Sequence, residues 1–188
     1  MTVHTKHKLS VEKYKQSLID QIEDIKEKVH LIFDSPESGK FNQRIIEKKW
    51  SVFEHLDHMN KTVAAYFVQM DKIAPNVSNN NVSSYQPGFK GNLFIKLMEP
   101  PPKIKLKTFG VFKPAADFNQ EAISKKFLEL RAEFESRVVE ACTKGKLKSK
   151  LSSPVSNLLK FELGEAFLIL TAHDRRHLYS IDNLMEKL

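Results

Sequence analysis

Cysteine and glycine are both scarce in this chain of 188 residues. The single cysteine, Cys142, cannot form a disulfide within the chain, so a reducing cytoplasm is the expected compartment. The count of 6 glycines favours helices over folds whose strands are joined by glycine-rich turns. No apolar run approaches the roughly 20 residues that cross a bilayer, and the N-terminus lacks the apolar stretch of a secretion signal. We therefore expect neither a membrane protein nor a disulfide-stapled one.

The residues that are abundant describe an ordinary globular protein with a basic surface. Hydrophobic residues make up 41% and charged residues 28%, and the net charge is +7. This length suits one domain, which we expect to span residues 1–188. Lysine is concentrated in residues 103–107 and 144–150, which contain neither arginine nor an aromatic residue. Such stretches are usually solubilising surface, so the expected partner is a small-molecule substrate rather than nucleic acid.

Four apolar stripes with helical spacing predict helices over about residues 11–33, 51–71, 119–143 and 163–187. The inward positions of these helices are listed by helix: Tyr14, Leu18, Ile22, Ile25, Val29 and Ile32; Val52, Leu56, Met59, Val63, Phe67 and Met70; Ile123, Phe127, Leu130, Phe134 and Val138; Phe167, Leu170, His177, Ile181 and Leu184. The second and third helices are joined by a long connection, in which residues 93–99 could add a helical turn. The expected fold is all-α, a four-helix bundle with a long crossover connection between helices 2 and 3.

Ser51 and Glu54 have the spacing of a capping box at the start of the second helix. In this motif the serine oxygen accepts from the backbone N–H of the glutamate, whose carboxylate reaches back to the serine N–H. Trp50, just before the cap, can pack on the fourth helical residue, His55. This gives Glu54 a structural role, which we prefer to a role as metal ligand or general base.

His173 and His177 lie four residues apart on the last helix, so both rings can reach one metal ion. From this spacing alone, two polar residues on a partly exposed helix edge are the favoured interpretation. A functional metal site needs at least one further ligand, and His55 and His58 on the second helix compete for that role. Helical phase slightly favours His55, but spacing does not decide between them.

The pattern W-S-x-x-E-x-L-x-H (residues 50–58), followed by a long connection and then H-x-x-x-H-L (residues 173–178), resembles the DinB-like superfamily. The resemblance implies a four-helix bundle, often a homodimer, which holds a divalent metal ion on one histidine of the second helix and two of the fourth. Those ligands are His58, His173 and His177 in this sequence, and zinc, nickel or iron would suit them. Many relatives have glutamine where this chain has Ser180.

The resemblance also implies a reaction. Some members transfer a low-molecular-weight thiol to an electrophilic small molecule, and three imidazoles leave a metal ion with a position open to such a cosubstrate. Nothing in the sequence connects Cys142 to the histidines, so the thiol would come from the cosubstrate. The alternatives are metal-dependent hydrolysis at the same site and a non-catalytic metal-binding stress-response protein. No residue stands out as general acid or base, so the catalytic residues stay unassigned.

Overall fold

The computed structural model describes residues 8–73, 83–115 and 119–188, and these residues are mostly helical. This part of the chain forms five α-helices: α1 (Val11–Phe33), α2 (Val52–Met70), α3 (Phe89–Met98), α4 (Gln120–Thr143) and α5 (Leu163–Met185). Two short 3-10 helices, Pro36–Lys40 and Gly110–Phe112, lie in the connections. None of the helices in the described ranges is long and apolar enough to span a membrane.

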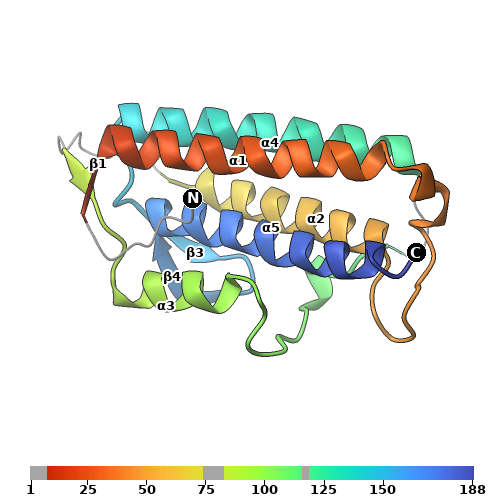
Figure 1. Ribbon diagram of the computed structural model, residues 1–188. Helices are drawn as coiled ribbons and strands as arrows, with labels where there is room; N and C mark the ends of the chain where they lie inside the picture. Colours follow the sequence, from red (N-terminus) through yellow and green to blue (C-terminus); the bar gives the residue numbers. More distant parts are fainter. Residues whose placement is uncertain (1–7, 74–82, 116–118) are drawn as a thin grey trace.

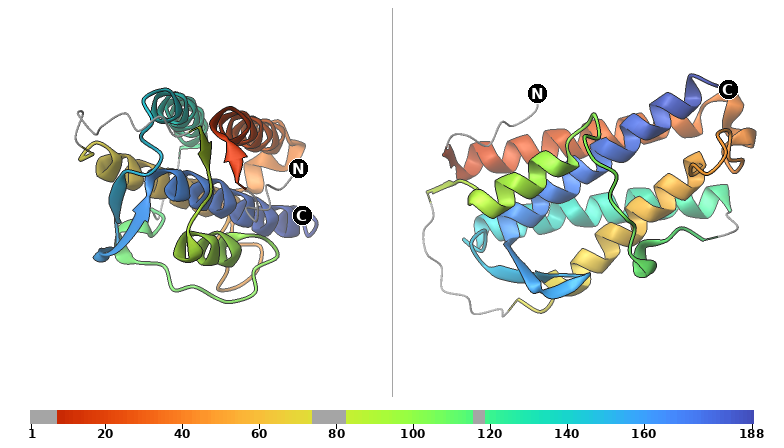
Figure 2. Two further views of the ribbon diagram at one scale, coloured as in Figure 1. Left: turned by 90° about the vertical axis from the view of Figure 1, so that its left-hand side faces the viewer. Right: turned by 90° about the horizontal axis from the view of Figure 1, so that it is seen from below.

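The four long helices lie in two pairs. In Figure 1, α1 runs beside α4 and α2 runs beside α5, and the end-on view of Figure 2 shows the two pairs stacked on each other. Contacts between the pairs join α1 to α5 and α2 to α4. The short helix α3 packs on the outer side of α5, away from α1 and α4. The side of α2 and α5 that faces α3 is where the candidate site lies.

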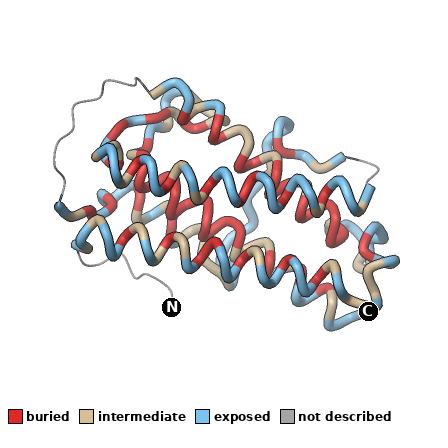
Figure 3. The backbone as a smooth tube through the Cα atoms, turned by 90° about the horizontal axis from the view of Figure 1, so that it is seen from above, coloured by how far each residue is buried: buried red, intermediate tan, exposed pale blue. Residues whose placement is uncertain are grey.

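The predicted helices are confirmed nearly to the residue. Ser51 caps α2 as predicted, and Asn119 caps α4; each accepts a backbone N–H with its side chain. All the predicted inward positions are buried except His177, which is partly exposed. In Figure 3 the buried positions, in red, recur along the helices between exposed and intermediate ones. α5 ends at Met185, two residues earlier than predicted.

The expectation of an all-α protein is met only in the coarser sense, because the chain also forms two antiparallel strand pairs. β1 (Leu9–Ser10) pairs with β2 (Ser84–Tyr85), and β3 (Lys150–Ser153) pairs with β4 (Ser156–Glu162). In the second pair Leu151 lies opposite Phe161, and both side chains are buried. This burial against the helices stabilises a hairpin too short to produce a clear sequence period.

The connection between α2 and α4 contains more structure than the predicted turn at residues 93–99. α3 occupies ten residues and lies close to the start of α5. Gly91 permits this approach, since a Cβ atom there would overlap the side chain of Glu165. The close packing of α3 on α5 also fixes where the following segment, residues 99–112, begins its path across the site.

Candidate metal centre

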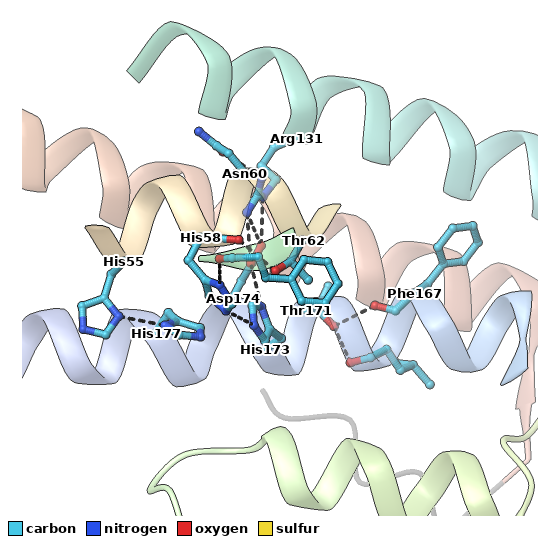
Figure 4. Close-up of polar contacts among 12 residues, drawn as sticks. His55, His58, Asn60, Thr62, Arg131, Phe167, Thr171, His173, Asp174 and His177 are labelled. Atoms are coloured by element: carbon cyan, nitrogen blue, oxygen red, sulfur yellow. Dashed lines mark hydrogen bonds and ion pairs between the residues drawn. The ribbon is translucent and has the colours of Figure 1, made fainter. Parts of the chain in front are cut away.

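Three histidines from two helices converge on one point. His58 of α2 and His173 and His177 of α5 each offer a ring nitrogen, and these three atoms all lie within 4.8 Å of one another. The Nε2 atoms of His58 and His173 are 3.0 Å apart (Figure 4). The ring centroids of His173 and His177 are 4.5 Å apart, as the spacing of four residues predicts. The structure therefore brings together the three residues that the resemblance implies, and their nitrogen atoms could hold a metal ion.

The tautomer of His58 follows from its backbone partner. Its Nδ1 lies 2.7 Å from the carbonyl oxygen of Phe112, which can only accept, so Nδ1 carries the proton. The lone pair of the neutral ring is then on Nε2, which faces His173. Burial, reinforced by the neighbouring His173, lowers the pKa of His58 to about 4. At neutral pH the ring is therefore uncharged, which is the form that binds metals.

His55 lies in a different position from His58, although both are buried on α2. Its Nδ1 is 2.8 Å from Nδ1 of His177, so one of these two atoms donates to the other (Figure 4). Burial lowers the pKa of His55 to about 4. The pKa of His177 also lies well below its ordinary value, because the ring is buried beside the other imidazoles. His55 thus contacts His177 of the three-histidine group and is not itself one of the three.

One ring nitrogen of the cluster is buried and unpaired. Nδ1 of His173 has no hydrogen-bond partner within the described ranges. The nearest carboxylate oxygen, Oδ1 of Asp174, is 3.8 Å away, beyond hydrogen-bonding distance. An unpaired buried nitrogen is costly, but Nε2 of the same ring faces His58, so an ion held between the Nε2 atoms would leave Nδ1 unpaired. Three imidazoles, with the lone pair of His58 on Nε2, suit zinc, nickel or iron better than magnesium or calcium, which prefer oxygen ligands.

The carboxylates nearest in sequence to the histidines have other partners. Asp174 accepts from Nε and Nη2 of Arg131, both at 2.9 Å, and neither residue is exposed. Asp57 pairs with Lys61 at 2.8 Å and accepts from the backbone N–H of Ala115 at 2.9 Å. These contacts give each carboxylate a partner other than the histidines. They also hold α2 and α5 in place around the rings.

Glu54 has the structural role that the sequence predicts. Its Oε2 accepts from the backbone N–H of Ser51 at 2.7 Å, while the Ser51 hydroxyl accepts from the Glu54 N–H at 3.2 Å. Arg44 donates to the same carboxylate from Nε at 2.9 Å. These donors hold the pKa of Glu54 below its ordinary value, against the opposing effect of burial. The capping box is therefore confirmed, and it fixes the turn of α2 from which His55 and His58 project.

Trp50 covers the cluster from the chain segment that leads into α2. Its ring centroid is 5.5 Å from that of His55, which confirms the predicted contact, and it also lies 4.9 Å from His58 and 6.1 Å from His177. The sequence contains no other tryptophan. Fluorescence excited beyond the absorption band of tyrosine therefore comes from Trp50 and reports on the surroundings of these three imidazoles.

The four histidines line a cavity of about 1270 Å³. Its walls also come from α3, which was predicted only as a helical turn at residues 93–99, and from the β3–β4 hairpin and residues 102–109, which sequence reasoning missed. The alternation of lysine and aliphatic residues at 103–107 was the only signal of the last of these. Comparison with protein-family models, with curated proteins and with solved structures finds no match. The basis for a function is therefore the geometry of the histidines and the cavity, together with the sequence pattern of residues 50–58 and 173–178.

Proposed function

We propose that the protein is a metal-dependent enzyme of the DinB-like type. It holds zinc, nickel or iron on His58, His173 and His177 and transfers a low-molecular-weight thiol to an electrophilic small molecule. The observation that carries the proposal is the convergence of three imidazole nitrogens within 4.8 Å at the wall of a large cavity. The resemblance of residues 50–58 and 173–178 to the superfamily supports the choice of reaction.

The chain's own residues position the ligands and exclude water. The carbonyl of Phe112 orients His58, and His55 orients His177. Trp50 and the ring of Phe112, 6.2 Å from that of His58, cover the imidazoles with apolar surface. A divalent ion at this site would supply Lewis acidity, which lowers the pKa of a thiol bound to it. The thiol proton passes to water, the sulfur electron pair forms the new C–S bond, and the leaving group departs with the electrons of the bond that breaks.

The finer architecture belongs to the same proposal. The packing of α1, α2, α4 and α5, with residues 71–119 joining α2 to α4, supports the four-helix bundle with a crossover that the superfamily has. A homodimer and a cytoplasmic location are inferred from the resemblance and the cysteine content.

The direct experiment is to load the purified protein with zinc, nickel or iron and to incubate it with bacterial thiols and a chromogenic electrophile. We expect conjugation that requires both metal and thiol, is lost in His58→Ala and is unchanged in Cys142→Ala. Cys142 is a suitable control because burial raises its pKa to about 11, so it is protonated at neutral pH. Turnover without thiol would instead indicate a metal-dependent hydrolase. Bound metal without turnover on any substrate would contradict enzymatic function and indicate the metal-binding stress-response protein.

A further inference from the structure

The cavity that contains the histidines has charges of one sign. Among the described residues that line it are six lysines and Arg176, but no aspartate or glutamate. The lysines are Lys48, Lys49, Lys103, Lys105, Lys107 and Lys187, and all are exposed. Six exposed ammonium groups around one opening, with no acid among them, produce a positive potential that attracts anions.

Most of these lysines have no carboxylate partner. Lys48 lies 3.7 Å from Glu47, and both side chains are almost fully exposed, so this pair is weak. The other five make no ion pair with any residue in the ranges that the structure describes. Their charge is therefore available to a ligand.

The second lysine-rich stretch behaves differently. Lys144 and Lys146 both pair with Glu140, at 2.9 and 3.6 Å, and Lys150 pairs with Glu162 at 3.0 Å. None of the lysines from 144 to 150 lines the cavity. Two stretches that look alike in the sequence therefore differ in the structure, since only residues 103–107 present unpaired ammonium groups to the site.

The segment with Lys103, Lys105 and Lys107 is anchored to the helix that carries two of the histidines. Arg176 donates from Nη1 to the carbonyl oxygen of Leu97 at 2.7 Å and from Nη2 to that of Ile104 at 2.6 Å. The neighbouring Arg175 forms an ion pair with Glu99. Two arginines thus hold residues 97–104 against α5, so the lysines keep a defined position at the cavity.

The cavity is apolar away from the lysines. Aromatic and aliphatic side chains from α3, β4 and α5 form its wall: Phe94, Leu97, Met98, Leu159, Phe161, Ile169 and Leu170. The volume of about 1270 Å³ exceeds the roughly 300–1000 Å³ of most small-molecule pockets, so there is room for an extended ligand. A ligand that matches both regions has an anionic head and a long apolar body.

We propose that this cavity binds amphipathic anions, with a carboxylate or phosphate head on the lysines of residues 103–107 and an apolar chain along the wall formed by α3, β4 and α5. A molecule of this kind whose chain also carries an electrophilic carbon with a leaving group is the substrate class of the enzyme. This last assignment rests on the proposed function, whereas the binding itself depends only on the lysines and the apolar wall.

The test is the binding of 11-(dansylamino)undecanoate to the metal-free protein in EDTA. Binding is measured by energy transfer to the dansyl group from Trp50, which also lines the cavity. We expect saturable binding that weakens with salt, and about tenfold weaker binding of the methyl ester, which lacks the charge. Dodecanoate and dodecyl phosphate should both displace the probe. The competitor that displaces it at the lower concentration shows whether the site prefers a carboxylate or a phosphate head. Dodecanol should displace it poorly. Equal affinity for acid and ester would overturn the proposal.

A matched pair of triple variants locates the head group. Replacement of Lys103, Lys105 and Lys107 by glutamine should weaken probe binding about tenfold, since each exposed ion pair contributes little on its own. The same change at Lys125, Lys126 and Lys148, which are exposed and outside the cavity, should have no effect. Circular dichroism checks folding, and Lys105→Gln alone should show a smaller effect in the same direction. An equal loss in both triple variants would refute the assignment of residues 103–107.

The result is separable from that of the proposed function. If the wild type takes up no metal while probe binding persists in His58→Ala, the metal centre is refuted and the binding of amphipathic anions is not. A wild type that holds metal but binds no amphipathic anion would refute only the present inference.

Discussion

His55 and His177 face each other through their Nδ1 atoms at 2.8 Å. If Nδ1 of His177 donates, its lone pair lies on Nε2, the other ring nitrogen, and His55 fixes that tautomer. This is the relationship in which a residue behind a metal ligand orients it without touching the ion. It gives His55 and His58 separate roles, although they lie one turn apart on the same helix.

Metal content should distinguish these roles. We expect His58→Ala and His177→Ala to lose the metal that elemental analysis finds in the wild type, because each removes one of three nitrogens. His55→Ala should still bind metal, but chelator competition should reveal an affinity about 10- to 100-fold lower, the usual effect of losing an orienting partner. Metal retained by His58→Ala and lost by His55→Ala would show that helical phase was the better guide.

Trp50 should report metal binding directly, since three imidazole rings lie within 6.1 Å of its own. We expect Ni²⁺ or Co²⁺, whose open d shells quench a nearby indole, to reduce its fluorescence at one equivalent. Zinc, which lacks this property, should displace the quencher and restore the signal. His173→Ala should abolish the response, while the exposed His30→Ala should not. Quenching that persists in His173→Ala would place the metal elsewhere.

The metal-free protein should lose stability as the pH falls below about 6.5. Burial lowers the pKa of His55 and His58 to about 4 in the folded protein, so between these values the unfolded chain binds protons that the folded chain does not. At pH 5 each histidine then reduces the free energy of unfolding by about 2 kcal/mol relative to pH 7. Urea unfolding at both pH values measures the loss.

Two variants test whether this loss comes from the cluster. His58→Gln should be about 2 kcal/mol less sensitive to the change from pH 7 to pH 5 than the wild type. His30→Gln, which removes an exposed histidine on α1, should have the wild-type dependence. A wild type and His58→Gln that respond equally would show that His58 titrates normally in the folded protein.

Asp174 should be essential for stability because it neutralises Arg131 in the interior. Neither side chain is exposed, and the guanidinium also lies 4.1 Å over the ring of Phe127. Asp174→Ala leaves a buried charge without a partner, which costs about 3–5 kcal/mol in the free energy of unfolding. The double variant Arg131→Leu/Asp174→Leu should be more stable than Asp174→Ala, because it removes both charges. Denaturant unfolding of the wild type and the two variants decides, and a double variant no more stable than Asp174→Ala would contradict the pairing.

The four long helices could be predicted because each repeats an apolar stripe over many turns. Leu18, Leu56 and Phe134 are buried because their spacing places them on the apolar face of their helices. The β3–β4 hairpin could not be predicted, since its strands are short and its register shifts between Ser152 and Ser153. Only the surface offered by the helices makes that hairpin stable.

The candidate site was partly predictable for related reasons. Spacing placed His173 and His177 together, but it could not separate His55 from His58, because both project toward α5 and both are buried. What separates them is a backbone carbonyl, that of Phe112, which has no signal in a side-chain pattern. The cavity could not be predicted either, because Arg176 anchors its edge through two main-chain oxygen atoms, and such contacts leave no side-chain pattern.

A single stretch of α5, residues 173–177, carries two of the imidazoles and, between them, the arginines that hold residues 97–104. A ligand in the cavity that strengthens these arginine contacts therefore also affects the positions of the histidine rings one turn away. Thermodynamic reciprocity then makes the coupling mutual: whatever factor an amphiphile adds to metal affinity, the metal must add to the affinity for the amphiphile.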